Sequence, residues 1–88
     1  MVERTVIIKN KTGLHARPAS KFVQTASKFK SSIILTTDGR TTNAKSIITL
    51  LSMGIHMGSE ITISAEGKDE SLAVKTLVDL IDRLAEEE

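Results

Sequence analysis

Alternating apolar and polar residues predict strands at residues 2–9 and 60–65. A run rich in β-branched residues predicts a third strand at residues 32–37. The pair Asp38-Gly39 follows directly and is a strong hairpin signal, so residues 40–43 are predicted to return as a fourth strand. The side chains expected to face the core are Val6, Ile8, Ile61, Ile63 and Ala65.

Apolar residues spaced by three and four predict a first helix after the first strand. Proline lacks an N–H group and is tolerated in the first turn of a helix, so this helix is expected to begin between His15 and Pro18. One conflict remains, because the residue before a proline, here Arg17, is disfavoured in helical conformation. The apolar positions of this helix are Ala16, Ala19, Phe22, Val23, Ala26 and Phe29.

Two further helices follow from the same spacing. The first is predicted at residues 46–53, with Ser46 as its N-cap and Gly54 as the residue that ends it. The second is predicted to begin at Asp69, another N-cap residue. We expect its acidic end, residues 86–88, to fray because the charges there oppose the helix dipole. The apolar stripe of this last helix is Ala73, Leu77, Leu80, Ile81 and Leu84.

The predicted elements follow the order βαββαβα, with short connections and one hairpin. We expect a single domain over residues 1–88, because a chain of 88 residues is long enough for one core of sheet and helices. The expected fold is α+β, an open-faced β-sandwich. Its four-stranded, mainly antiparallel sheet would carry three helices on one face.

Composition excludes several classes of function. The chain has no cysteine, so it can form neither a disulfide nor a thiolate metal site. It has two phenylalanines, no Trp or Tyr, and a formal net charge of +1, all of which argue against nucleic-acid binding. Without a signal-peptide pattern or a long apolar run, we expect a cytoplasmic protein with no membrane insertion. His15 and His56 lack a metal-ligand pattern, so no metal or cofactor is expected, and His56 is expected at the surface.

The segment Gly13-Leu14-His15-Ala16-Arg17-Pro18-Ala19 is the chief candidate for a functional site. It sets a histidine and an arginine at a helix start, where free N–H groups and the positive end of the dipole favour an anion. Imidazole is a nucleophile that can carry a phosphoryl group, and Arg17 can pair with the phosphoryl oxygens. The alternative, more frequent for a lone histidine, is a surface residue at a loop–helix junction.

The ten residues Asn10-Lys11-Thr12-Gly13-Leu14-His15-Ala16-Arg17-Pro18-Ala19 closely resemble the active-site signature of HPr. HPr is the histidine-containing phosphocarrier of the bacterial phosphoenolpyruvate:sugar phosphotransferase system. The similarity covers essentially the whole chain. It extends through Phe22-Val23-Gln24, Asn43-Ala44-Lys45-Ser46, Ser52-Met53-Gly54 and Ile61-Thr62-Ile63-Ser64-Ala65-Glu66-Gly67.

The resemblance implies a role for each residue around the histidine. His15 would accept a phosphoryl group on Nδ1 from enzyme I, originally from phosphoenolpyruvate, and pass it to the enzyme IIA components of sugar transporters. Arg17 would steady that group, the backbone N–H groups of Ala16 and Arg17 would bind it, and Thr12 would belong to the same phosphate site. Such a protein is a stoichiometric carrier with a phosphohistidine intermediate rather than a turnover enzyme. We expect it to be a monomer.

Ser46 is a second site that the resemblance implies. In Gram-positive relatives an ATP-dependent HPr kinase phosphorylates a serine in this context, so Ser46 is either a regulatory site or only a helix cap. The segment Ser46-Ile47-Ile48-Thr49-Leu50-Leu51-Ser52-Met53-Gly54 lacks the glycine and both methionines of the usual Gram-positive pattern. The expected docking surface for partner proteins consists of Ala16, Ser20, Ile47, Ile48 and Leu51.

The alternative function is a regulatory binding module of the same family. A transcription regulator would recognise it through phosphorylated Ser46, or it would serve a nitrogen-related phosphotransferase branch. Regulatory relatives can dispense with the phosphorylatable histidine, so the presence of His15 argues against a purely regulatory role.

Overall fold

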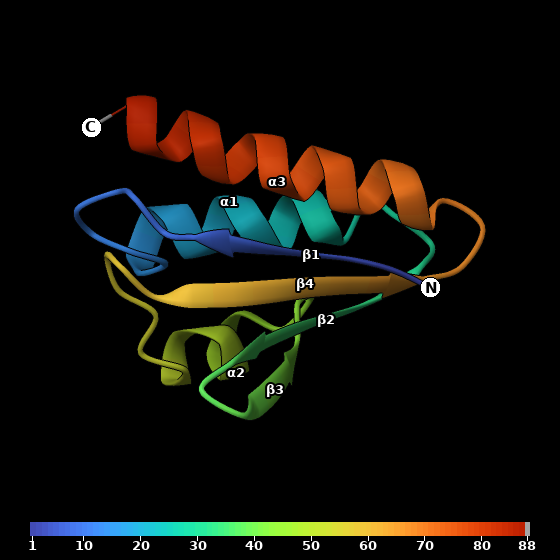
Figure 1. The fold of residues 1–88 in the computed structure, drawn as a ribbon, viewed down its shortest axis with the longest axis horizontal. Coiled ribbons are helices and arrows are strands. Elements are labelled where there is room, and N and C mark those ends of the chain that lie inside the picture. The colour runs from blue at the N-terminus through green and yellow to red at the C-terminus, as the bar shows by residue number, and fades with distance from the viewer. Residues whose placement is uncertain (88) are drawn as a thin grey trace.

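The strands and helices follow one another along the chain in the order that the sequence predicts (Figure 1). The computed structural model describes residues 1–87. The elements in chain order are β1 (Val2–Ile7), α1 (Ala16–Ala26), β2 (Ser32–Thr37), β3 (Arg40–Asn43), α2 (Ile47–Ser52), β4 (Glu60–Glu66) and α3 (Glu70–Glu86).

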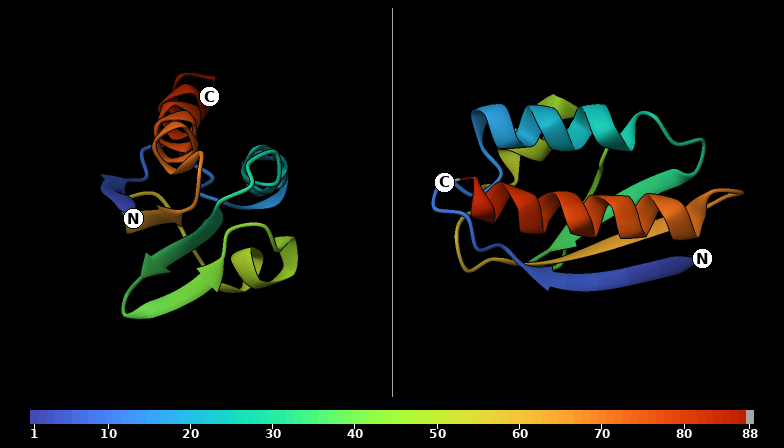
Figure 2. Two further views of the ribbon diagram at one scale, coloured as in Figure 1. Left: turned by 90° about the vertical axis from the view of Figure 1, so that its right-hand side faces the viewer. Right: turned by 90° about the horizontal axis from the view of Figure 1, so that it is seen from above.

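The strands form one antiparallel sheet in the order β1-β4-β2-β3. The register places Val6 of β1 opposite Ile61 of β4, and Leu35 of β2 opposite Ile63. All three helices lie on the same side of this sheet, and the other face is left open (Figure 2). The fold is therefore the α+β open-faced sandwich that the sequence predicts.

The core lies between the sheet and the helices, and alternation along the strands selects which side chains enter it. Ile61, Ile63 and Ala65 are buried, as predicted from the pattern of β4. Phe22 reaches the same core from α1 and is also fully buried. The predicted stripe of α3 is buried along its whole length. Within residues 1–87, no helix combines the length and apolar character needed to cross a membrane.

The hairpin between β2 and β3 turns at Asp38-Gly39. Both residues have positive φ, 51° at Asp38 and 74° at Gly39. Left-handed backbone at both central positions is the type I′ turn, whose twist matches that of the flanking strands. The hairpin therefore lies where the sequence signal predicts it, and the structure adds the conformation of the turn.

The two predicted N-cap residues occupy their positions, but neither caps with its side chain. Ser46 precedes α2 and Asp69 precedes α3, and neither side chain makes a capping hydrogen bond. The Asp69 carboxylate instead accepts hydrogen bonds from the backbone N–H of Lys30 at 2.9 Å, the N–H of Ser31 at 3.0 Å and the Ser31 hydroxyl. The prediction that these two residues cap their helices through their side chains is therefore wrong. For Asp69 the reason is that the segment before β2 offers it more hydrogen-bond donors than its own helix does.

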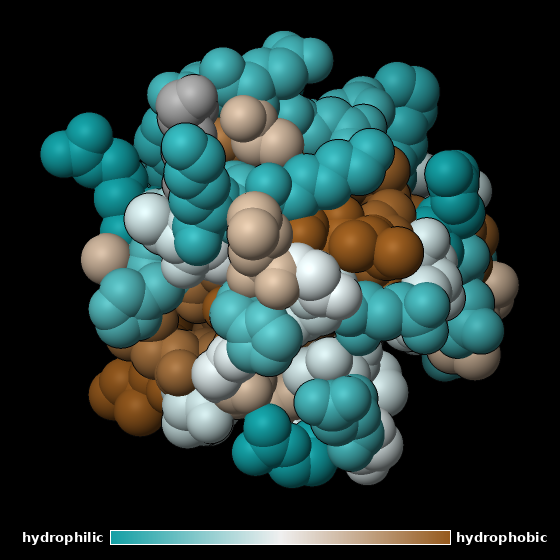
Figure 3. All heavy atoms as spheres, turned by 60° about the vertical axis from the view of Figure 1, so that its left-hand side comes forward, coloured by the Kyte–Doolittle hydropathy of each residue, from teal (hydrophilic) through white to brown (hydrophobic). Residues whose placement is uncertain are grey.

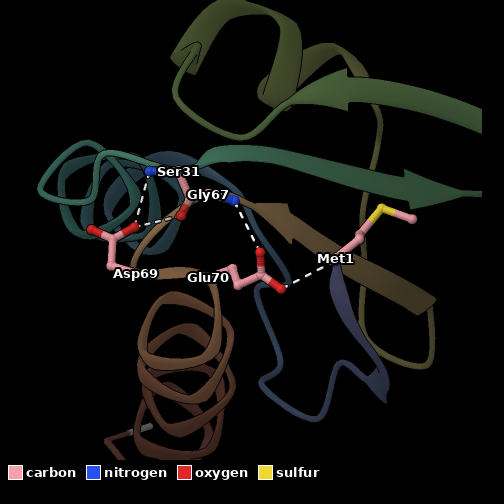
Figure 4. Close-up of polar contacts among 5 residues, drawn as sticks. All are labelled: Met1, Ser31, Gly67, Asp69 and Glu70. Atoms are coloured by element: carbon pink, nitrogen blue, oxygen red, sulfur yellow. Dashed lines mark hydrogen bonds and ion pairs between the residues drawn. The ribbon is translucent and has the colours of Figure 1, made fainter.

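A second carboxylate extends this network at the start of α3 (Figure 4). Glu70 accepts a hydrogen bond from the Gly67 N–H at 3.1 Å and pairs with the Met1 ammonium at 3.1 Å. These contacts join the start of β1, the end of β4 and the start of α3.

The acidic end of α3 is helical further than the sequence predicts. The helix continues to Glu86, the Glu87 N–H donates to the Arg83 carbonyl at 3.0 Å, and the Glu87 carboxylate pairs with Lys21 of α1 at 3.2 Å. The predicted fraying is therefore wrong for Glu86, which is part of the helix, and Lys21 supplies a positive charge to the C-cap residue Glu87. Glu88 lies outside the described residues.

The Asp69 network predicts a specific dependence of stability on pH. The Ser31 hydroxyl first, and then the Lys30 N–H, lower the pKa of Asp69 to about 2. A lowered carboxyl pKa stabilises the fold above the unfolded value of about 3.9, and this stabilisation is lost as pH falls through the folded value. Ser31→Ala should therefore lower the free energy of unfolding by a constant amount above pH 5, and the difference should shrink toward pH 2.

Urea unfolding of the two proteins from pH 7 to pH 2 measures this difference. Ser32→Ala, at the neighbouring exposed position, is the matched control and should show no such pH dependence. An offset for Ser31→Ala that is equally large at pH 2 and pH 7 would contradict the assignment.

Candidate functional site

The loop between β1 and α1, which carries the candidate histidine, is fastened to the loop between α2 and β4. The Ile8 N–H donates to the Ser59 carbonyl at 2.9 Å, and the Gly58 N–H donates to the Ile8 carbonyl at 2.8 Å. Further along, the Leu14 N–H donates to the Ile55 carbonyl at 3.2 Å. The two loops are thus joined at both ends of residues 8–14, directly before His15.

Gly13 is the point where the two loops come closest. Its φ is +63°, and a Cβ at this position would lie 2.4 Å from the Ile55 carbonyl oxygen and 2.6 Å from the His56 Cα. Both are backbone atoms, so a side chain could be admitted only by moving one loop away from the other. The glycine before the candidate histidine therefore has a steric reason as well as a conformational one.

Asn10 closes the turn that leads to Gly13. Its carbonyl accepts the Gly13 N–H at 3.1 Å, and its side-chain Nδ2 donates to the Gly13 carbonyl at 2.7 Å. Its side chain is buried, with 1% of the residue exposed. Asparagine is a common turn residue, but nothing in the sequence signals that this one lies inside the protein.

His15 is the N-cap residue of α1, with extended backbone at φ −134° and ψ 148°. It is exposed, and its ring makes no capping hydrogen bond. The helix begins at Ala16, within the predicted interval, and Arg17 is helical despite the proline that follows it. The imidazole therefore stands beside the first turn of a helix, where backbone N–H groups have no partner within the helix.

Ala16 has a positive φ of 49°. Left-handed backbone costs a residue with a Cβ about 1–2 kcal/mol. The sharp change of direction between the extended His15 and α1 is thus concentrated in one strained residue. The fastened loop before it holds that residue in place.

Arg17 and Thr12 line a shallow hollow of about 230 Å³ between the start of α1 and the end of α3. Lys21, one turn further along α1, adds a second cation, which is paired with Glu87. His15 does not line the hollow, although it precedes Arg17 by two residues. The structure thus gathers Thr12, Arg17 and Lys21 on the α3 side of the histidine. The complete lining is Thr12, Arg17, Pro18, Lys21, Leu84 and Glu87.

The expected docking residues lie on the other side of the histidine, where α1 contacts α2. Ile48 is 77% exposed and Leu51 is 39% exposed, whereas Ile47 is half-buried against the core. From α1, Ala16 is exposed and Ser20 half-buried. Apolar side chains gather over α2 at the lower left of Figure 3. We call Ile48 and Leu51 the α2 patch.

Ser46 is half-buried at the start of α2, and its backbone is held from two directions. Its N–H donates to the Asn43 carbonyl at 3.1 Å, and its carbonyl accepts the Thr49 hydroxyl at 3.3 Å. The same Thr49 oxygen accepts the hydroxyl of Thr42 at 2.6 Å. Thr49 therefore links the first turn of α2 to β3.

His56 is exposed in the loop after α2, as expected. Its Nδ1 lies 2.9 Å from the Met57 carbonyl. Among residues 1–87, no group of three or more histidine, cysteine or acidic side chains is arranged to hold a metal ion.

Known proteins resemble this chain over almost its full length. The family model described as "PTS HPr component phosphorylation site" matches residues 2–83. The HPr-like protein Crh of Halalkalibacterium halodurans is 49% identical over 83 residues, which are 94% of this chain and 99% of Crh.

Solved structures agree with this result. HPr-C-His from Thermoanaerobacter tengcongensis is 56% identical and superposes with a TM-score of 0.96, covering 100% of this chain and 99% of the other. Crh of Bacillus subtilis, whose crystal structure revealed a swapped-domain dimer, is 42% identical with a TM-score of 0.75, covering 97% and 98%.

The close approach at Gly13 predicts the effect of a single methyl group. Gly13→Ala should lower the free energy of unfolding by about 2–4 kcal/mol, because the cost of left-handed alanine adds to that of overpacking. Gly54 has nearly the same φ, +66°, but a Cβ there would meet no atom within 4 Å, so Gly54→Ala should cost only about 1–2 kcal/mol. Urea unfolding compares the two variants. Equal losses would show that the contact with Ile55 and His56 is unimportant.

Proposed function

This chain belongs to the HPr family, and we propose that it is a phosphocarrier whose His15 accepts and donates a phosphoryl group. The observation that carries the proposal is the exposed imidazole at the start of α1, with Arg17 in the first helical turn. The phosphoryl donor would be enzyme I, charged from phosphoenolpyruvate, and the acceptors would be enzyme IIA components of sugar transporters.

The chemistry requires only a nucleophile and a place for negative charge. A lone pair on Nδ1 of His15 forms the new N–P bond while the bond between phosphorus and the donor breaks, and that electron pair stays with the donor. The positive end of α1 and the free N–H groups of its first turn favour the dianionic product. Arg17 adds a charge-assisted hydrogen bond, and Thr12 shares the hollow beside it.

The α2 patch supports docking of partner proteins beside the histidine. It exposes most of Ile48 and part of Leu51 on α2, the helix that contacts α1 and its residues Ala16 and Ser20. A carrier must release each partner after transfer, so a small interface with rapid dissociation suits the role. Ile47, the third expected docking residue of α2, is half-buried against the core and would support the patch from beneath.

A second, regulatory function at Ser46 is favoured by the likeness to Crh. The Bacillus subtilis Crh structure is named for catabolite repression. A phosphate on Ser46 would sit at the start of α2, where the helix dipole tolerates negative charge. It would add about two negative charges beside the α2 patch and oppose acidic partners. HPr kinase and a transcription regulator would be the partners in this role.

The assembly state is proposed to be a monomer. β1 pairs with β4 of the same chain along Val2–Ile7, so the sheet is completed without a second copy. Crh of Bacillus subtilis shows that a relative can form a swapped-domain dimer.

The phosphocarrier proposal is tested by incubating the protein with phosphoenolpyruvate and enzyme I. His15→Ala should abolish the acid-labile label, because no nucleophile remains at the start of α1. His56→Ala is the matched control, since it removes the other histidine, and should be labelled as fast as the unaltered protein. Arg17→Ala should slow labelling about 10- to 100-fold, equivalent to the ~1.5–3 kcal/mol of a charged hydrogen bond. Undiminished labelling of His15→Ala would sink the assignment.

The regulatory proposal is tested with ATP and HPr kinase. The unaltered protein should take up acid-stable phosphate, and Ser46→Ala should not. Ser52→Ala, which alters an exposed serine at the other end of α2, should be labelled normally. If the unaltered protein remains unlabelled, the Ser46 function is rejected and the His15 function is unaffected.

A further inference from the structure

We infer that Asn10 is the positioning residue for His15 and acts through the peptide group between Gly13 and Leu14. The inference rests on the proposed phosphocarrier function. Asn10 Nδ2 donates to the Gly13 carbonyl at 2.7 Å, and the Leu14 N–H of the same peptide group donates to the Ile55 carbonyl at 3.2 Å. A peptide group is planar, so holding its C=O and its N–H from opposite sides fixes the orientation of the whole plane.

Only one residue, Leu14, separates this fixed plane from the residue that carries the chemistry. Leu14 is buried, and His15 follows it with extended backbone. Ala16, next in the chain, is held at a φ of 49°. Strained backbone persists only where its surroundings determine it. If the Gly13–Leu14 plane were free to rotate, the strain could relax through His15 and move its ring away from the first turn of α1.

The remaining polar atom of Asn10 indicates that the side chain is not there for stability alone. The residue is only 1% exposed, and its Oδ1 atom is buried with no hydrogen-bond partner within residues 1–87. A buried acceptor without a donor destabilises the fold, and an apolar side chain would avoid this cost. The amide orientation is also determined, because the reverse would place Oδ1 against the Gly13 carbonyl oxygen.

If Asn10 served folding alone, its loss would have different effects on the kinetics than if it positioned His15. Asn10 lies inside the protein and its side chain bonds the Gly13 carbonyl, so loss of this donor removes no atom of the α2 patch and should leave docking intact. Misorientation of the imidazole should instead slow transfer within the docked complex, since small displacements of a reacting group cost large factors in rate. The expected signature is a lower kcat with an unchanged KM for this protein as the substrate of enzyme I.

Two substitutions remove the donor in different ways. Asn10→Leu keeps the approximate volume and removes both polar atoms, and Asn10→Ser leaves a hydroxyl too short to span the same distance. Ser31→Ala is the matched control, because Ser31 is equally buried and hydrogen-bonded but lies just before β2, in the Asp69 network. The amide NMR spectrum of each variant is recorded first, to confirm that the variant is folded.

Both Asn10 variants should lower kcat for labelling by enzyme I about 10- to 100-fold. Their KM should stay within about twofold of the original, because the docking surface is unchanged. Hydrogen exchange at the Leu14 N–H should become faster in the same variants, and Ser31→Ala should change none of these quantities.

Three results would overturn the inference. They are an unchanged kcat in the folded Asn10 variants, an equal loss in Ser31→Ala, or a loss that lies in KM alone. Failure of the unaltered protein to be labelled would overturn the phosphocarrier function and the inference with it. If the unaltered protein is labelled normally and one of the three results is found, the inference about Asn10 fails and the phosphocarrier function stands.

Discussion

The contact between two loops at Gly13 is the constraint on which the candidate site depends. One loop carries His15, and the other connects α2 to β4. At Gly13 their backbones approach so closely that no Cβ fits between them. The second loop also begins where α2 ends, so the loop that carries His15 is fastened to the segment that follows the α2 patch.

Around this contact, tertiary structure overrides local preference several times. Arg17 is helical before a proline, and Ala16 adopts a left-handed conformation that glycine would adopt at less cost. Asn10 is buried with one polar atom unpaired. Such departures from local rules concentrate at functional sites in proteins. Here they fall within seven residues of one another, on either side of His15.

The sequence predicted the sheet, the helices and the hairpin because each depends on a periodic or strictly local signal. It did not predict the partners of Asp69, because Lys30 and Ser31 are distant from it in the sequence. It did not predict the burial of Asn10 either, because burial depends on how the whole turn packs against the rest of the fold. The neighbours His15 and Arg17 could be proposed together because they are close in sequence. The sequence could not show that Glu87 closes the hollow beside Arg17, because that requires knowing that α3 ends where α1 begins. The α2 patch was proposed from resemblance, and the structure adds that Ile47 faces partly inward.

The order of strands in the sheet determines when the site can form during synthesis. His15 leaves the ribosome early, but the residues that fasten its loop, Ile55, Gly58 and Ser59, emerge much later. β1, which lies at the edge of the sheet, likewise waits for β4, the strand it pairs with. Contacts between such distant segments form late and set the pace of folding. A growing chain therefore displays His15 long before the loop that carries it can be fastened, and the candidate site is completed together with the sheet.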